Sequence, residues 1–146
     1  MKHLSWKYLA GLVDGEGCID VQINSGKYVF PRLRVALVAP SGFLLEICKA
    51  NYGGYLSHRK GSGTHQDSIC WELCNYTRVC PVLRNLVNHL LLKKEQARFC
   101  LWMETNTKGL HVGTLVRDAI RDELKLMKTD PHRLSEQAQE RILPLL

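Results

Sequence analysis

Residues 9–17 read Leu9-Ala10-Gly11-Leu12-Val13-Asp14-Gly15-Glu16-Gly17, and this stretch decides the fold. Gly11 and Gly15 are four residues apart, so in a helix they lie on one face and leave a strip without side chains. Such a strip favours the close approach of a second helix, and tight packing within the chain would explain the same spacing. Asp14 and Glu16 stand where the helix ends and a strand begins. Their carboxylates are therefore expected at the rim of a sheet, where a divalent metal and a phosphate can meet.

The segments around this stretch predict an α+β domain. Apolar residues recur at helical spacing over residues 4–13, and Ser5 precedes them as an N-cap. From residue 17 the apolar period changes to two, which predicts an antiparallel hairpin with its turn at residues 24–27. The predicted elements are, in order, a helix (4–13), strands (17–24 and 28–38), a helix (43–50), strands (55–60 and 68–76), helices (77–90 and 94–104) and two tail helices, whose apolar positions span residues 112–127 and 134–142.

Three local signals refine these boundaries. Pro31 predicts that the strand over residues 28–38 is an edge strand or has an irregular start, because proline cannot donate to a ladder. Thr77 is the predicted N-cap of its helix. Asp130 and Pro131 are predicted as the N-cap and the first residue of the last helix.

Composition limits the class of protein. The chain has 146 residues, of which 45% are hydrophobic and 23% charged, as expected for one globular domain. No apolar run approaches the ~20 residues that a membrane span needs, and the first residues resemble no signal peptide. We therefore expect an intracellular protein that is neither secreted nor embedded in a membrane. The net charge of +6 favours a polyanionic partner, either nucleic acid or an acidic membrane surface.

The six cysteines predict free thiols in a reducing compartment. They form no C-x-x-C pair, and no H-x₃₋₅-H segment follows to complete a zinc site. A metal site made of Cys70, Cys74 and His65 is the alternative. The six are Cys18, Cys48, Cys70, Cys74, Cys80 and Cys100.

The stretch at residues 9–17 resembles the motif of the LAGLIDADG homing endonucleases, in the variant that ends Gly-Glu-Gly. Residues 5–104 resemble the family, and the tail lies outside this region. The resemblance implies the family's fold, α-β-β-α-β-β-α with a saddle-shaped antiparallel sheet, plus extra C-terminal helices. It implies an endonuclease core over residues 1–108 and a helical extension over residues 109–146 that packs on the core or on a partner subunit. Further matches are Pro31, Arg32-Leu33-Arg34-Val35, Leu44-Leu45-Glu46-Ile47, Gly53-Gly54-Tyr55 and Leu92-Lys93-Lys94-Glu95-Gln96-Ala97.

The resemblance also implies a chemistry, the metal-dependent hydrolysis of phosphodiester bonds in double-stranded DNA. Glu16 is implied as the acidic metal ligand, with the backbone carbonyl of Gly15 beside it. The implied metal is Mg²⁺, and Mn²⁺ should substitute. Lys93 is implied as the basic residue near the scissile phosphate, with its neighbour Lys94 as the alternative. Family members often add a polar side chain after the second strand, where this chain has residues 39–41, Ala-Pro-Ser.

A chain with a single motif resembles those family members that pair two identical subunits through the motif helix. The implied enzyme is a homodimer that cuts each DNA strand once. A two-fold protein recognises a site of matching symmetry, so a long, near-palindromic target is expected. Asp14 is expected to support the turn or the interface rather than to bind metal. The implied interface residues are Ala10, Gly11, Asp14 and Gly15.

Polar side chains alternate with apolar ones along the predicted strands, and the resemblance implies that this polar face lies in the major groove of one half-site. Such side chains can contact phosphate or bind base edges. Residues 68–76 have apolar side chains on both faces, and we expect Glu72 to face the DNA. The expected DNA-binding residues are Asp20, Gln22, Asn24, Lys27, Tyr28, Arg32, Arg34, Ser57, Arg59 and Glu72.

The function that these observations favour is a site-specific homing endonuclease, encoded in a mobile intron, in an intein or alone. The same scaffold could instead serve as a maturase that binds intron RNA, or as a DNA-binding regulator without chemistry. Such a regulator would be expected to lack the acidic ligand, which Glu16 provides here. A different class is an interaction protein whose amphipathic tail docks on a partner helix.

Overall fold

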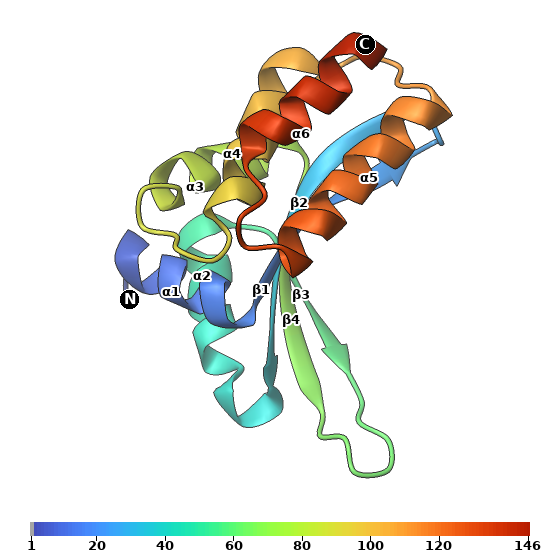
Figure 1. Cartoon of the computed structure of the whole chain (residues 1–146). Coiled ribbons are helices and arrows are strands. Elements are labelled where there is room, and N and C mark those ends of the chain that lie inside the picture. The colour runs from blue at the N-terminus through green and yellow to red at the C-terminus, as the bar shows by residue number, and fades with distance from the viewer. Residues whose placement is uncertain (1) are drawn as a thin grey trace.

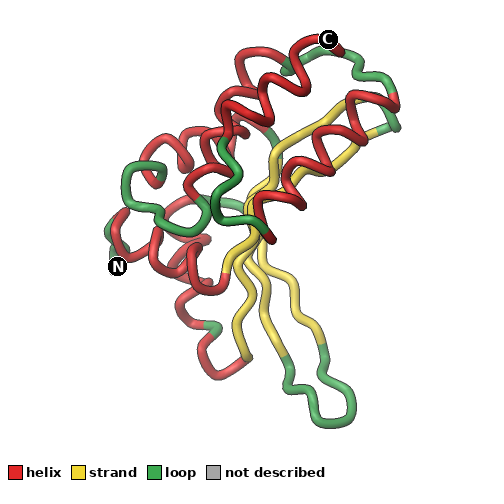
Figure 2. Tube along the Cα trace, viewed as in Figure 1, coloured by secondary structure: helices red, strands yellow, loops and turns green. Residues whose placement is uncertain are grey.

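Helices and hairpins follow one another in the predicted α+β order, which the computed structural model, describing residues 2–146, confirms. Figures 1 and 2 show one twisted sheet with most of the helices against one of its faces. The loop that joins β3 and β4 projects beyond the rest of the molecule (Figure 1). The elements are α1 (Trp6–Glu16), β1 (Gly17–Asn24), β2 (Tyr28–Val38), the 3₁₀ turn η1 (Ala39–Ser41), α2 (Phe43–Tyr52), β3 (Tyr55–Arg59), β4 (Ser68–Cys74), α3 (Tyr76–Leu86), α4 (Lys94–Asn106), α5 (Thr114–Thr129), α6 (Ser135–Ile142) and η2 (Leu143–Leu145).

The four strands form an antiparallel sheet in the order β1-β2-β4-β3. The strand that contains Pro31 is therefore an inner strand, and the prediction of an edge strand is wrong. Pro31 is tolerated because its carbonyl accepts from the backbone N–H of Asn75 (3.0 Å), just after β4 ends. The N and the C=O of one strand residue point to the same side, so the missing N–H of Pro31 faces the end of β4 and interrupts no ladder bond.

The first helix is longer than predicted and includes the whole acidic end of the motif. It continues to Glu16, and the strand begins at once with Gly17. A Cβ atom on Gly17 would lie 2.6 Å from the backbone oxygen of Val13, so only glycine permits this abrupt change of direction. The motif thus places Glu16 at the junction of helix and strand.

Two predicted helix starts are wrong. Asn75 rather than Thr77 caps α3: its side chain accepts from the N–H of Arg78, and its φ of 71° is tolerated by asparagine. Asp130 ends α5 instead of starting the last helix, and its carboxylate accepts from the N–H of His132 in a local turn (2.9 Å). The last helix begins at Ser135.

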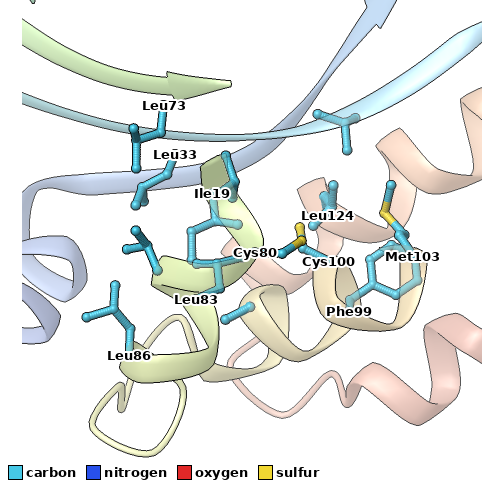
Figure 3. Close-up of a cluster of buried hydrophobic side chains, with 14 of the residues drawn as sticks. Ile19, Leu33, Leu73, Cys80, Leu83, Leu86, Phe99, Cys100, Met103 and Leu124 are labelled. Atoms are coloured by element: carbon cyan, nitrogen blue, oxygen red, sulfur yellow. The ribbon is translucent and has the colours of Figure 1, made fainter. Parts of the chain in front are cut away.

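The main core lies between the sheet and the helices (Figure 3). Ile19, Leu33 and Leu73 project from the strands. They meet apolar side chains of α3 and α4, among them Leu83 and Phe99. The tail belongs to the same buried cluster, since Ile120, Leu124, Met127, Ala138 and Ile142 are all part of it.

The tail packs along β1, an edge strand, and against α4. The N–H of Val112 donates to the backbone oxygen of Lys27 in the first hairpin (2.8 Å). Glu123 is only 1% exposed, and its carboxylate receives two bonds from Arg133 (2.9 and 2.7 Å) and one from Arg141 (3.3 Å). This ion cluster, built around one buried carboxylate, joins α5 to α6 and to the turn between them.

The cysteines are free thiols in the structure. Cys48, Cys80 and Cys100 are buried, while the other three are partly exposed. Burial raises the pKa of Cys48 to about 11 and that of Cys80 to about 12, so both thiols are protonated at neutral pH. No helix within residues 2–146 is long and apolar enough to cross a membrane.

Replacing Glu123 with alanine should destabilise the fold by about 2–4 kcal/mol, because two arginines lose a buried partner. The matched control is Asp122→Ala, since Asp122 is 63% exposed and meets Arg141 only at 3.5 Å. We expect the control to change stability by less than about 0.5 kcal/mol. Urea unfolding at fixed protein concentration measures both values, and equal losses would show that the Glu123 cluster contributes nothing beyond surface charge.

Candidate nucleic-acid interface

The carboxylate of Asp14 fixes the segment that precedes α4 onto the end of α1. One oxygen accepts from the N–H of Leu91 (2.7 Å), and the other accepts from the N–H groups of Leu92 (3.1 Å) and Lys93 (3.0 Å). Lys93 is the N-cap of α4, so one side chain satisfies three backbone donors at a helix start. Asp14 therefore supports the turn, and its carboxylate is engaged within the chain.

Lys93 returns a contact to the motif. Its Nζ donates to the backbone oxygen of Asp14 (2.7 Å), one of the carbonyls in the last turn of α1. Lys94 is exposed and lines a separate hollow with Arg98 of α4 and Gln139 of α6. Of the two lysines, the structure brings only Lys93 to the acidic end of the motif.

Glu16 is exposed and makes no hydrogen bond or ion pair with the rest of the described chain, residues 2–146. It lies at the edge of a hollow of about 350 Å³ over the open face of the sheet. Residues 39–41, which follow the second strand, do not line this hollow. The chain therefore differs here from the family pattern, in which a polar side chain often follows the second strand. The other lining residues are Cys18, Arg34, Ala36, Ser57, Arg59, Ser68, Cys70 and Glu72.

Strand register places the expected recognition residues on one face of the sheet. Directly opposite residues of neighbouring strands share a face. Asp20 pairs with Arg32, Arg34 pairs with Glu72, and Glu72 pairs in turn with Tyr55 of β3. Glu72 therefore lies on the polar face, and its contact with DNA stays a prediction. By the same alternation this face includes Asp20, Gln22, Asn24, Tyr28, Arg32, Arg34, Ser57, Arg59 and Glu72, with Lys27 in the adjoining turn.

The charges at the centre of this polar face are paired. Asp20 accepts two bonds from Arg32 (both 2.9 Å) and one from Arg34 (2.9 Å), while Glu72 lies 3.5 Å from Arg32. The hydrogen bond with Asp20 raises the pKa of Arg32, which stays charged at any working pH. The carboxylates hold both guanidinium groups in fixed directions, and Arg34 Nε is buried without a hydrogen-bond partner within the described residues.

Cys74, Cys70 and Tyr55 are polar-face residues that we did not predict. Cys74 Sγ lies 3.4 Å from Glu72, from Gln22 and from the Tyr55 hydroxyl. Burial raises the pKa of Cys74, and the hydrogen bond with Cys74 raises the pKa of Tyr55. The period of two, counted from Glu72, would have placed Cys70 and Cys74 on this face once the strand's phase was known.

The glycine strip on α1 is open. A Cβ atom added to Gly11 or Gly15 would meet nothing within 4 Å, so packing within the chain does not explain these glycines. The strip adjoins exposed apolar side chains: Leu91 is 88% exposed and Leu92 68%, both in the segment that Asp14 holds. Ala10 is fully buried inside the chain and has no surface to offer, which corrects its place in the predicted interface.

One chain does not complete a metal site. Within residues 2–146, no group of three His, Cys, Asp or Glu residues could hold an ion, so the alternative site at Cys70, Cys74 and His65 does not form. The donors at the motif end are the carboxylate of Glu16 and the last carbonyls of α1, among them that of Gly15. Oxygen donors of this kind suit Mg²⁺ or Mn²⁺, and a hard cation there needs further oxygen ligands from outside the chain.

Solved structures of homing endonucleases share this fold. Two DNA complexes of the homing endonuclease I-CvuI match with TM-scores of 0.69 and 0.65 and identities of 24% and 26%, over 96% of this chain and 93% of theirs. The archaeal intron-encoded homing endonuclease I-Vdi141I, complexed with DNA, matches with a TM-score of 0.63 and 18% identity, over 94% of this chain and 96% of its own. No protein-family model and no curated protein sequence matches the chain.

The chain has the LAGLIDADG homing endonuclease fold, and the resemblance predicted from residues 9–17 is confirmed. The LAGLIDADG homing endonuclease I-GzeII, in complex with its DNA target, matches with a TM-score of 0.56 and 16% identity over 99% of this chain but only 50% of its own. The matched region thus spans nearly the whole length of the I-CvuI and I-Vdi141I chains and about half that of I-GzeII.

Replacing Asp14 with alanine should cost about 2 kcal/mol or more of stability, because three amides lose a charged acceptor. Asp14→Asn should cost less, since one side-chain oxygen remains. The amides of Leu91, Leu92 and Lys93 should exchange hydrogen faster in the alanine variant, while those of the α3 interior keep their protection. Unchanged exchange at these three amides would contradict the role given to Asp14.

Proposed function

We propose that the chain is a site-specific homing endonuclease that hydrolyses phosphodiester bonds in double-stranded DNA, as a homodimer and with Mg²⁺. One observation carries the proposal: the exposed Glu16 lies at the edge of the hollow over the polar sheet face, and Lys93 contacts the backbone of Asp14, two residues before it. An unpaired carboxylate and an ammonium group are the charges that metal-assisted phosphoryl chemistry uses. The neighbours I-CvuI and I-Vdi141I, both complexed with DNA, support the substrate class.

The polar face suits a DNA major groove. Its paired arginines are oriented before binding, so less side-chain entropy is lost on contact. Arg59 and Lys27 make no ion pair with any other described residue and are available for phosphates. Double-stranded DNA therefore fits the face and the net charge of +6 better than an acidic membrane surface, because oriented arginines on a strand face can bind base edges as well as phosphates.

The residues at the end of the motif would have different roles in the reaction. Glu16 and the carbonyl of Gly15 would hold the metal, together with phosphate oxygens of the DNA. Bound there, a divalent ion would polarise the phosphate and lower the pKa of water. Lys93, held against the carbonyl of Asp14, would stabilise negative charge on the phosphate. One I-CvuI complex contains DNA in the presence of Ca, and the other contains uncleaved DNA in the presence of Mg, which supports the use of a divalent ion.

A second copy of the chain is the partner that the open strip on α1 fits. Gly11 and Gly15 allow two helices to approach closely, and Leu91 and Leu92 extend the apolar surface. A two-fold axis at this strip would bring both Glu16 residues near each other and supply the missing metal ligands. The match to only half of I-GzeII supports the same arrangement, since a single chain there has twice the length.

The proposal is tested with a randomised duplex library. Bound sequences are selected in Ca²⁺, and the recovered duplex is then incubated with Mg²⁺. We expect a near-palindromic consensus that the wild type cuts on both strands. Glu16→Gln should bind it with unchanged affinity and cut at least about 100-fold more slowly, and EDTA should abolish cutting. The control Glu46→Gln alters an exposed glutamate on α2 and should cut normally.

Each other outcome has a definite meaning. Cutting by Glu16→Gln at the wild-type rate would remove Glu16 from the site. Specific binding without cutting by the wild type would reject the endonuclease and favour a DNA-binding regulator. Failure to select any duplex, together with binding to intron RNA, would favour a maturase.

The homodimer is tested by filling the glycine strip. Gly11→Leu should leave the folded chain intact, because a Cβ atom at this position meets nothing within 4 Å. It should weaken the dimer roughly 10- to 100-fold, since overpacking of a close contact costs about 1–3 kcal/mol. Gly113→Leu is the control at a second open glycine, away from α1. Sedimentation equilibrium measures the dissociation constants, and equal values for the two variants would place the dimer contact elsewhere.

A further inference from the structure

Lys128, from the tail, reaches the start of the first strand. It is an exposed residue in the last turn of α5, and its Nζ lies 3.0 Å from Sγ of Cys18. Cys18 follows Glu16 by two residues. In Figure 1 the C-terminal end of α5 lies close to the junction of α1 and β1. A segment outside the region of sequence resemblance therefore places a positive charge beside the end of the motif.

This lysine shares a hollow with Lys93. The hollow has a volume of about 430 Å³, and its wall includes Gly17 and Cys18 of β1, Lys93 before α4, and Lys128 of α5. No carboxylate lines it, and Lys128 forms no ion pair with any residue of the described chain. A thiol is a weak acceptor, so the three donors of the ammonium group are largely unsatisfied. Two ammonium groups around one hollow without an acid favour an anion there.

Cys18 also lines the hollow in which Glu16 lies. The two hollows are therefore neighbours on either side of the first residues of β1. A DNA strand whose phosphate reaches Glu16 would pass directly beside the hollow that contains Lys93 and Lys128. Phosphate diesters of that strand are the anions that the pair of lysines fits.

We propose that Lys128 binds the DNA backbone at the cleavage site, on a phosphate beside the one that Lys93 contacts. This inference rests on the proposed function. It gives the tail a part in binding the substrate, in addition to its packing on the core. Lys128 is then a substrate-binding residue whose charge helps to position the strand at Glu16.

The test compares Lys128→Met with Lys125→Met, which removes the same charge from the same helix one turn away. Both are measured on the duplex selected in Ca²⁺ by the wild type. For Lys128→Met we expect the salt dependence of binding, the slope of log K against log salt, to fall by about 1.8, or about 0.9 for each subunit's lost phosphate contact. Single-turnover cutting in Mg²⁺ should slow about tenfold. Lys125→Met should keep the wild-type cutting rate, and Lys128→Arg should restore most of it.

A structural role for Lys128 would lower the melting temperature without changing the salt slope, and that result would overturn the inference. Equal behaviour of the Lys128→Met and Lys125→Met variants would also overturn it, because net charge alone would then explain the loss. Both results leave cutting by the wild type intact and so leave the proposed function standing. If the wild type itself neither binds nor cuts a selected duplex, the proposed function fails, and this inference fails with it.

Discussion

The contact between Asp14 and the segment before α4 is the constraint on which the rest of the site depends. The Asp14 carboxylate accepts three backbone N–H groups, and its own carbonyl accepts the ammonium group of Lys93. These four bonds join the first helix to a helix that begins about 80 residues later. Because both ends of the contact are fixed, Glu16 and Lys93 stand at the same rim of the sheet. Asp14 thus positions the segment that contains Lys93. Glu16, two residues further along the chain, has no such contact and is free to bind a ligand.

The glycines of the motif have two further structural roles. Gly17 permits the turn from helix to strand, because any side chain there would meet the backbone of Val13. A Cβ atom at Gly11 or Gly15 would meet no described residue within 4 Å, so both positions are open for a close contact. The same nine residues therefore fix a turn inside the fold and leave a bare strip on its surface. A second copy seated on this strip would join two half-sites that each chain leaves incomplete.

The sequence predicted the fold, because its signals were local or matched a long motif. Period-two alternation placed Asp20, Arg32 and Arg34 on one face, and the structure agrees. Prediction from the sequence failed where contacts between distant segments determine the local structure. The phase of β4 depends on its partners, so Cys70 and Cys74 were missed, and Pro31 was misjudged because the end of β4 could not be foreseen. Burial of Ala10 and the approach of Lys128 to Cys18 depend on packing between segments far apart in the chain.

In the proposed dimer, two copies of the motif end make one cleavage site, and each copy supplies its own Glu16. Wild-type and Glu16→Gln chains, mixed in denaturant and refolded together at varying ratios, test this claim in single-turnover double-strand cutting of the selected duplex. Random pairing predicts a cut fraction that follows the square of the wild-type fraction, so an equal mixture cuts about a quarter as much as the wild type alone. A linear dependence, with about half the cutting at equal mixture, would show that one chain suffices and would contradict the account.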